Sequence, residues 1–171
     1  VYNGATALGS TAATAGGTFS FTPASSIGTD GTKAITATAT DAATNVSASS
    51  TTFNLVLDTA PPAQPTITTA TNPFNDTTPT VTGSAETGST VRIYNGATEV
   101  ASCTAAAGAY SCTTSALGVD GTKSLTARAT DAVGNQSVAS TVLSYALDTT
   151  APAQPTITTA TNPSNDSTPT V

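Results

Sequence analysis

Residues that could do chemistry are few in this chain, and most of them are acidic. The 171 residues include ten Asp and Glu, four Lys and Arg, two Cys and no His. Without His, no Ser–His or Cys–His pair can activate a nucleophile. The carboxylates are scattered over predicted turns, and no pair of them has a context that would raise a pKa for acid–base work. The sequence therefore predicts a protein without enzymatic activity.

The two cysteines, Cys103 and Cys112, flank a predicted hairpin turn at residues 105–108. A disulfide across this turn would contribute roughly 2–4 kcal/mol in the loop-entropy account. It would form only in an oxidising compartment. Two buried free thiols are the alternative.

The charge balance excludes two classes of partner. The net charge is −6, and the four basic residues are spread along the chain. Nucleic acids and anionic membrane surfaces both require a basic patch, so neither is an expected partner. The sequence contains no apolar run of the roughly 20 residues that a membrane-spanning helix needs.

A tandem repeat with a period near 90 residues organises the chain. Residues 58–81 return as residues 148–171 with 20 of 24 positions identical, and residues 1–6 and 30–33 align with 93–98 and 120–123. Thr11 and Phe21 stand where the later copy has its cysteines, so the disulfide would be an addition to one copy. Such periodicity is typical of arrays of small domains. We predict a repeat lacking its first strands at 1–57, a complete repeat at 58–147 and the first strands of a further repeat at 148–171.

The complete repeat reads as seven β-strands and no long helix. Alternating Thr, Val, Ile and Ala runs are separated by Gly, Pro, Asn and Asp, which favour turns. The predicted strands are 64–68, 78–83, 89–95, 98–104, 109–114, 122–130 and 136–147. Seven short strands in about 90 residues indicate an all-β Greek-key sandwich. The side chains expected to face inward are Ile67, Val81, Val91, Ile93, Leu125, Ala127, Ala129, Leu143, Tyr145 and Leu147.

The two partial repeats would be half-sandwiches with open edges, which we do not expect to be stable alone. Two explanations stay open at this point. Either the sequence samples a longer array, or the missing strands come from a neighbouring subunit.

Several motifs in fixed order resemble those of a known family. They are LDTTAPAQPTI, NDSTPTV, TGSAETGSTVRIYNG and DGTKSLTARATDAVGNQS, and together they cover the whole chain. The chain is similar to bacterial Ig-like repeats, which build the stalks of large secreted adhesins and biofilm-associated surface proteins. The resemblance implies tandem immunoglobulin-like β-sandwiches that act as a rigid, calcium-stiffened spacer.

The acidic residues offer candidate ligands for that calcium. In the predicted topology, Asp30, Asp58, Glu86 and Asp131 converge where the first two repeats meet. Asp120 and Asp148 occupy the corresponding positions at the following junction. Calcium takes six to eight oxygen ligands, which carboxylates and loop carbonyls could supply. The alternative is that these residues only cap local backbone amides in Asx turns.

The expected function is therefore a structural stalk, secreted or held on a bacterial cell surface, that supports adhesion or biofilm formation through reach and rigidity. Its expected partners are neighbouring repeats, with host or matrix glycans and proteins as further candidates. One rival function is a non-covalent filament assembled by strand complementation between subunits. The other is a module that binds glycans or host proteins through its loops.

Overall fold

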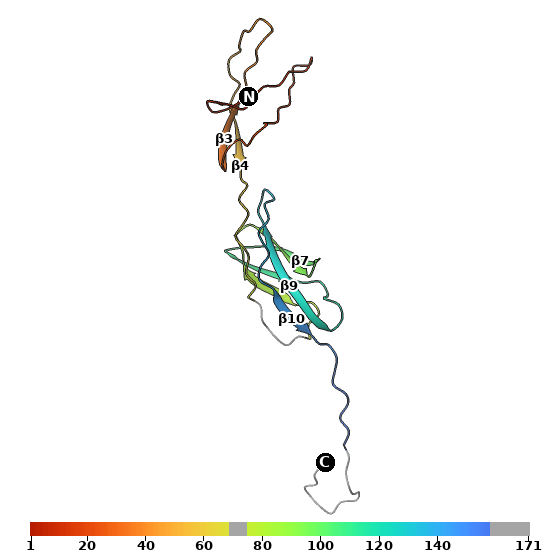
Figure 1. Cartoon of the computed structure of the whole chain (residues 1–171). Coiled ribbons are helices and arrows are strands. Elements are labelled where there is room, and N and C mark those ends of the chain that lie inside the picture. The colour runs from red at the N-terminus through yellow and green to blue at the C-terminus, as the bar shows by residue number, and fades with distance from the viewer. Residues whose placement is uncertain (69–74, 158–171) are drawn as a thin grey trace, which may run out of the picture.

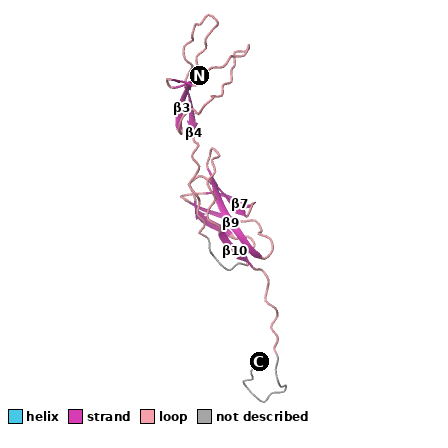
Figure 2. Ribbon diagram, viewed as in Figure 1, coloured by secondary structure: helices cyan, strands magenta, loops and turns pink. Residues whose placement is uncertain are grey.

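A computed structural model describes residues 1–68 and 75–157, and every helix or strand assigned in that part of the chain is a β-strand (Figure 1, Figure 2). Most of the predicted third repeat lies outside the described residues. The strands are β1 (Tyr2–Asn3), β2 (Thr6–Ala7), β3 (Gly31–Thr36), β4 (Phe53–Leu57), β5 (Thr80–Ser84), β6 (Thr90–Asn95), β7 (Thr98–Thr104), β8 (Ala109–Thr113), β9 (Gly121–Thr130) and β10 (Leu143–Leu147).

These strands form three antiparallel sheets. Residues 1–57, here called the first repeat, hold one sheet in the order β2-β1-β3-β4. Residues 58–147, the second repeat, hold the sheet β10-β9-β6-β7 and the pair β5-β8. Buried side chains from both sheets of the second repeat join in a single core cluster, so the two sheets form a sandwich.

Local sequence explains the strand ends. A two-residue loop joins β6 to β7 after Asn95, and its first residue, Gly96, has a φ of 61°. The loop between β1 and β2 repeats this arrangement, with Gly4 at a φ of 57°. Glycine adopts this left-handed conformation without steric cost, which is why an Asn-Gly pair between alternating segments predicts a hairpin.

The predicted inward set of the second repeat is confirmed. Eight of its ten side chains are buried, and Ile67 and Leu143 are partly buried against the same cluster. The prediction missed apolar residues from β7, β8, the turn between them and the segment after β8. The missed core members are Val100, Ala105, Tyr110, Cys112 and Leu117.

The strand predicted over 136–147 is only partly regular. Its last five residues form β10. Residues 137–142 run beside β9, but three residues of this segment span the same length as two residues of β9. Ser137 N–H donates to the Ala129 carbonyl at 2.9 Å, and Ser140 N–H donates to the Ala127 carbonyl at 2.8 Å. The side chains that point inward therefore recur every third residue. The expected alternation was wrong over this stretch.

The strand predicted over 64–68 runs along β5 without forming a regular ladder. Thr66 N–H donates to the Ser84 carbonyl at 2.9 Å, and Thr68 N–H donates to the Thr82 carbonyl at 2.8 Å. In the other direction, Ser84 N–H donates to the Thr66 side-chain oxygen at 3.1 Å. A hydroxyl thus replaces one carbonyl of the ladder, and Pro65 beside it has no N–H to donate.

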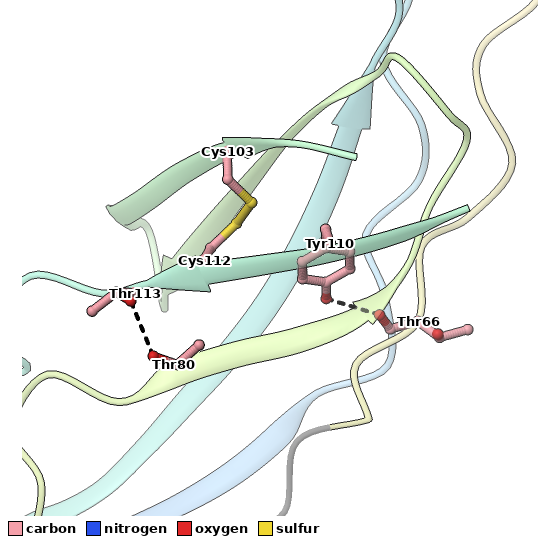
Figure 3. The surroundings of a disulfide bond; sticks show 6 residues. All are labelled: Thr66, Thr80, Cys103, Tyr110, Cys112 and Thr113. Atoms are coloured by element: carbon pink, nitrogen blue, oxygen red, sulfur yellow. Dashed lines mark hydrogen bonds between the residues drawn. A yellow bond between two sulfur atoms is a disulfide. The ribbon is translucent and has the colours of Figure 1, made fainter. Parts of the chain in front are cut away.

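The Cys103–Cys112 disulfide is present, as the sequence predicts, and it joins the two sheets of the sandwich (Figure 3). Cys103 lies on β7 and Cys112 on β8, so the bond ties neighbouring strands that belong to opposite sheets. Near it, the Tyr110 hydroxyl donates to the Thr66 carbonyl at 2.8 Å. These two contacts hold β7, β8 and the segment 64–68 on the same core.

Candidate functional site at the repeat junction

The junction between the repeats begins with an aspartate that holds the linker. Asp30 directly precedes β3, and the pairing of Gly31 with Leu57 sets it opposite the residues that follow β4. One oxygen of its carboxylate, Oδ1, accepts hydrogen bonds from Thr59 N–H at 3.0 Å and from the Thr59 hydroxyl at 2.8 Å. The first residues of the linker are therefore fastened to the repeat that they leave.

The second repeat has the same arrangement with one more bond. Asp120 Oδ1 accepts from Thr149 N–H at 2.8 Å and from the Thr149 hydroxyl at 2.7 Å, while its Oδ2 accepts from the Thr150 hydroxyl at 2.6 Å. The Thr150 hydrogen bond is the largest of the effects that lower the pKa of Asp120 below its ordinary value of 3.8, followed by those from Thr149. The first junction lacks this bond because residue 60 is Ala.

A self-contained loop after β9 of the second repeat supplies the other half of the junction. Asp131 Oδ1 accepts the backbone N–H groups of Val133, Gly134 and Asn135 at 2.8–2.9 Å. Its Oδ2 accepts from the Asn135 side-chain amide at 2.8 Å. Burial alone would raise the pKa of Asp131, but the hydrogen bonds from Asn135 and the two other amides outweigh it and lower the pKa.

Asn135 then reaches across to the linker. Its side-chain Nδ2 donates to the Asp58 carbonyl at 3.1 Å and approaches the Ala60 carbonyl at 3.5 Å. Three consecutive linker residues, 58–60, are thus held from both sides. Asp30 of the first repeat binds the middle residue, and Asn135 of the second repeat binds the carbonyls on either side of it.

The equivalent loop of the first repeat forms with all but one of these side-chain bonds, because Thr44 N–H donates to the Asp41 carbonyl and not to its carboxylate. Asp41 accepts the N–H groups of Ala43 and Asn45 at 2.9 and 2.8 Å, and its Oδ2 accepts from the Asn45 side chain at 2.9 Å. The Asn45 side chain is the largest cause of the lowered pKa of Asp41. The Asp41 loop is therefore held by its own internal hydrogen bonds.

The family of the chain follows from its sequence match. The sequence model of the bacterial Ig-like domain matches residues 1–59 and 65–149. The chain belongs to this family. The two matched segments coincide with the first and second repeats of the structure. The sandwich of the second repeat is the architecture that the family name describes. A search of curated proteins found no match.

Bacterial Ig-like domains are typically non-catalytic structural modules, and they are generally found on extracellular or surface proteins. In the described part of this Ig-like chain, no helix is long and apolar enough to cross a membrane. The family therefore suggests a surface or extracellular structural module.

The acidic residues predicted as calcium ligands make local hydrogen bonds, those of Asp30, Asp120 and Asp131 being described above. Asp58 Oδ1 accepts from Ala60 N–H at 3.1 Å, and Asp148 Oδ1 accepts from Thr150 N–H at 3.0 Å, so both make Asx turns. Glu86 lies in the turn between β5 and β6, where its carbonyl accepts from Ser89. Within residues 1–68 and 75–157, no three His, Cys, Asp or Glu side chains are gathered closely enough to hold a metal ion. Calcium binding stays a prediction.

The sequence did not reveal the role of Asn135 or the two serines that follow it. Ser137 and Ser140 accept the N–H groups of Ala129 and Ala127, each at 2.9 Å. The first repeat does the same with Ser47 and Ser50. A signal was present in both copies, because an Asp and an Asn four residues apart are followed by Ser, two residues and Ser. Such spacing could have indicated a bonded loop followed by a three-residue period.

Proposed function

We propose that this chain is a spacer segment in the stalk of a secreted bacterial surface adhesin or extracellular fibre. It supports adhesion or biofilm formation by its reach and rigidity. The observation that supports the proposal is the linker at residues 58–60, which is hydrogen-bonded by the repeat before it and by the repeat after it. A linker that only tethered two independent domains would need none of these bonds.

The residues after the hydrogen-bonded linker add stiffness. Pro61 and Pro62 have a fixed φ, and Pro62 is buried. Pro65 is fully buried in the second repeat. Bending the junction would therefore require breaking the bonds to Asp30 and Asn135, because the neighbouring backbone has little freedom of its own.

The linker after the second repeat is held in the same way as the linker before it, so a series of such repeats would be stiff along its length. Asp120 binds Thr149 and Thr150 as Asp30 binds Thr59, so the second repeat holds the linker that follows it in the same way. In such arrays, stability is approximately a sum of repeat and nearest-neighbour terms. The partners of this segment are the neighbouring repeats, with host or matrix glycans and proteins as further candidates.

Junction stiffness can be measured directly. Nitroxide labels at Thr32 on β3 and Ser144 on β10, both exposed strand positions, would report the distance between the two repeats. We expect a narrow distance distribution that broadens in Asn135→Ala. Asn45→Ala is the matched control, because it removes the same loop bond without touching the linker. An unchanged distribution in Asn135→Ala would contradict the proposal.

A further inference from the structure

Two arginines face each other on the outer surface of the second repeat. Arg92 on β6 pairs directly with Arg128 on β9. In both strands these residues alternate with buried members of the core, so both guanidinium groups lie on the face of the sheet that is turned away from the core. The fold thus gathers on one face two of the four basic residues, which are spread along the sequence.

This arrangement is unfavourable for the protein by itself. Like charges directly opposite each other on neighbouring strands destabilise a sheet. The first repeat has Thr38 at the position that corresponds to Arg128, so the second arginine is a feature of the second repeat. Departures of this kind from the local rules of stability are expected mainly at functional sites. The pair therefore points to an anionic ligand that neutralises it.

The contacts within the protein leave most donors of both arginines available. Arg92 Nε lies 3.5 Å from Glu99 Oε2, and this ion pair is weak because its side chains are 38% and 44% exposed. Arg128 Nη1 donates to the Ser137 carbonyl at 3.3 Å and approaches Gln136 Oε1 at 3.5 Å. A guanidinium group has five N–H donors in a planar fork that matches a carboxylate. Within residues 1–68 and 75–157, most of these donors have no protein partner on either arginine.

The side chains around the arginines favour a sugar over a protein as the ligand. Tyr94 lies on the same face as Arg92 and pairs with Thr126, and Thr90 precedes them on β6. All three are partly exposed. Hydroxyl groups and an aromatic ring can meet the hydroxyls and the apolar faces of a sugar. The outward positions of β6 and β9 hold no large aliphatic side chain, whereas the core of a protein interface is apolar.

The charge on this face limits the ligand further. Among the acidic residues that the structure describes, only Glu99 lies on a strand, so this face is positive in a protein with a net charge of −6. Two arginines match a single carboxylate. They do not match the series of phosphates that a nucleic-acid site must neutralise.

We propose that Arg92 and Arg128 bind the carboxylate of an acidic saccharide, such as a uronic acid unit. The hydroxyls of Thr90 and Thr126 contact the hydroxyls of the sugar, and its ring lies against Tyr94. The site lies on the face of the sheet and not on the loops at its ends. The inference rests on the proposed extracellular spacer function, to which it adds a partner of defined chemistry.

The test is titration of the full chain with a tetramer of galacturonic acid, measured by calorimetry and by amide chemical shifts in NMR spectra. We expect saturable binding with a Kd on the order of 1 mM or lower, and shift changes centred on β6 and β9. The neutral galactose tetramer should not bind.

Arg92→Gln and Arg128→Thr should each weaken binding about tenfold or more, because each removes charge-assisted hydrogen bonds to the carboxylate. Both variants should fold normally, since each removes one of two like charges, and thermal melting checks this. Lys33→Gln is the matched control, because it removes the same charge from the first repeat and should bind as the unmodified chain does.

Three results would overturn the inference. The first is no binding of the acidic tetramer at millimolar concentration, and the second is unchanged binding in folded Arg92→Gln and Arg128→Thr variants. The third is equally tight binding of a tetraglutamate peptide, which would assign the arginine pair to an acidic protein partner. The nitroxide distances across the junction are measured without saccharide, so the spacer proposal and this inference can fail separately.

Discussion

Two buried serines in the second repeat should contribute more to the free energy of unfolding than the equivalent exposed serines of the first repeat. Ser140 Oγ accepts from Ala127 N–H at 2.9 Å, and Ser137 Oγ accepts from Ala129 N–H at 2.9 Å. Both alanines are fully buried, and the serines are 6% and 2% exposed. Replacing either serine with alanine leaves one buried N–H of β9 without its acceptor.

The expected cost follows from that loss. An unsatisfied buried donor costs about 1–3 kcal/mol. The other bonds of these hydroxyls, to the carbonyls of Val138 and Thr141, should cost less to lose because both residues are exposed to water. We therefore expect Ser137→Ala and Ser140→Ala each to destabilise the second repeat by about 1–3 kcal/mol. For a domain of this size, each kcal/mol lowers Tm by about 4–8 °C.

Urea denaturation of the full chain, followed by circular dichroism with the disulfide oxidised, measures the cost. Ser144→Ala is a control on exposed β10 surface and should change stability by less than about 0.5 kcal/mol. Ser47 and Ser50 make equivalent bonds in the first repeat but are exposed, so their alanine variants should cost less. Unchanged urea midpoints in Ser137→Ala and Ser140→Ala would refute the reasoning.

Three further predictions concern covalent, ionic and metal contributions. Replacing Cys103 and Cys112 with alanine should destabilise the second repeat by roughly 2.7 kcal/mol, the loop-entropy value for about ten residues, and leave the first repeat unchanged in calorimetry. The pKa of Asp120 is lower in the folded state, so its contribution to stability is present above pH 3.8 and is lost as the pH falls through the folded pKa. Asp120→Asn should therefore weaken the dependence of Tm on acidic pH. A variant whose Tm changes with pH in the same way as that of the unmodified chain would contradict this. Calcium should raise Tm relative to chelator if the junction carboxylates bind it, and equal midpoints would remove calcium from the account.

Sequence reasoning located the sandwich because strand alternation and turn residues are local properties. Asn95-Gly96 fixed a hairpin, and the inward residues of β6 and β9 followed from a period of two. It failed over residues 137–142 because hydroxyl groups there take the place of carbonyls, which changes the period to three. An expectation built on backbone ladders alone cannot include such a substitution.

The junction was predictable only in part for a related reason. Topology leads us to expect Asp30, Asp58, Glu86 and Asp131 near the linker, because antiparallel pairing fixes which loops share an end of the sandwich. It does not specify which atoms bond. The structure shows Asp30 bound to Thr59 and Asp131 organising the loop from which Asn135 reaches the linker. Partner choice depends on distances of a few tenths of an ångström, which composition and spacing do not encode.

A glycine in β5 determines how closely the segment after the linker can approach the core. A Cβ at Gly83 would lie 1.9 Å from the Thr66 carbonyl oxygen and 2.7 Å from the Tyr110 hydroxyl. Gly83→Ala must therefore displace the backbone at Thr66. That displacement would disrupt the Tyr110 bond and the Thr66 bond to Ser84, which at about 0.5–1.5 kcal/mol each predicts a loss of about 1–3 kcal/mol.

The consequence of Gly83→Ala should extend to the junction, because residues 64–68 directly continue the segment that includes Pro61 and Pro62. If that segment loses its place on β5, the prolines lose their anchor and the nitroxide distance distribution should broaden even with Asp30 and Asn135 intact. Gly16→Ala is the control, since the nearest atom to its added Cβ would be 3.9 Å away. A destabilised Gly83→Ala variant with an unchanged distance distribution would show that the hydrogen bonds to residues 58–60 hold the junction without help from the core.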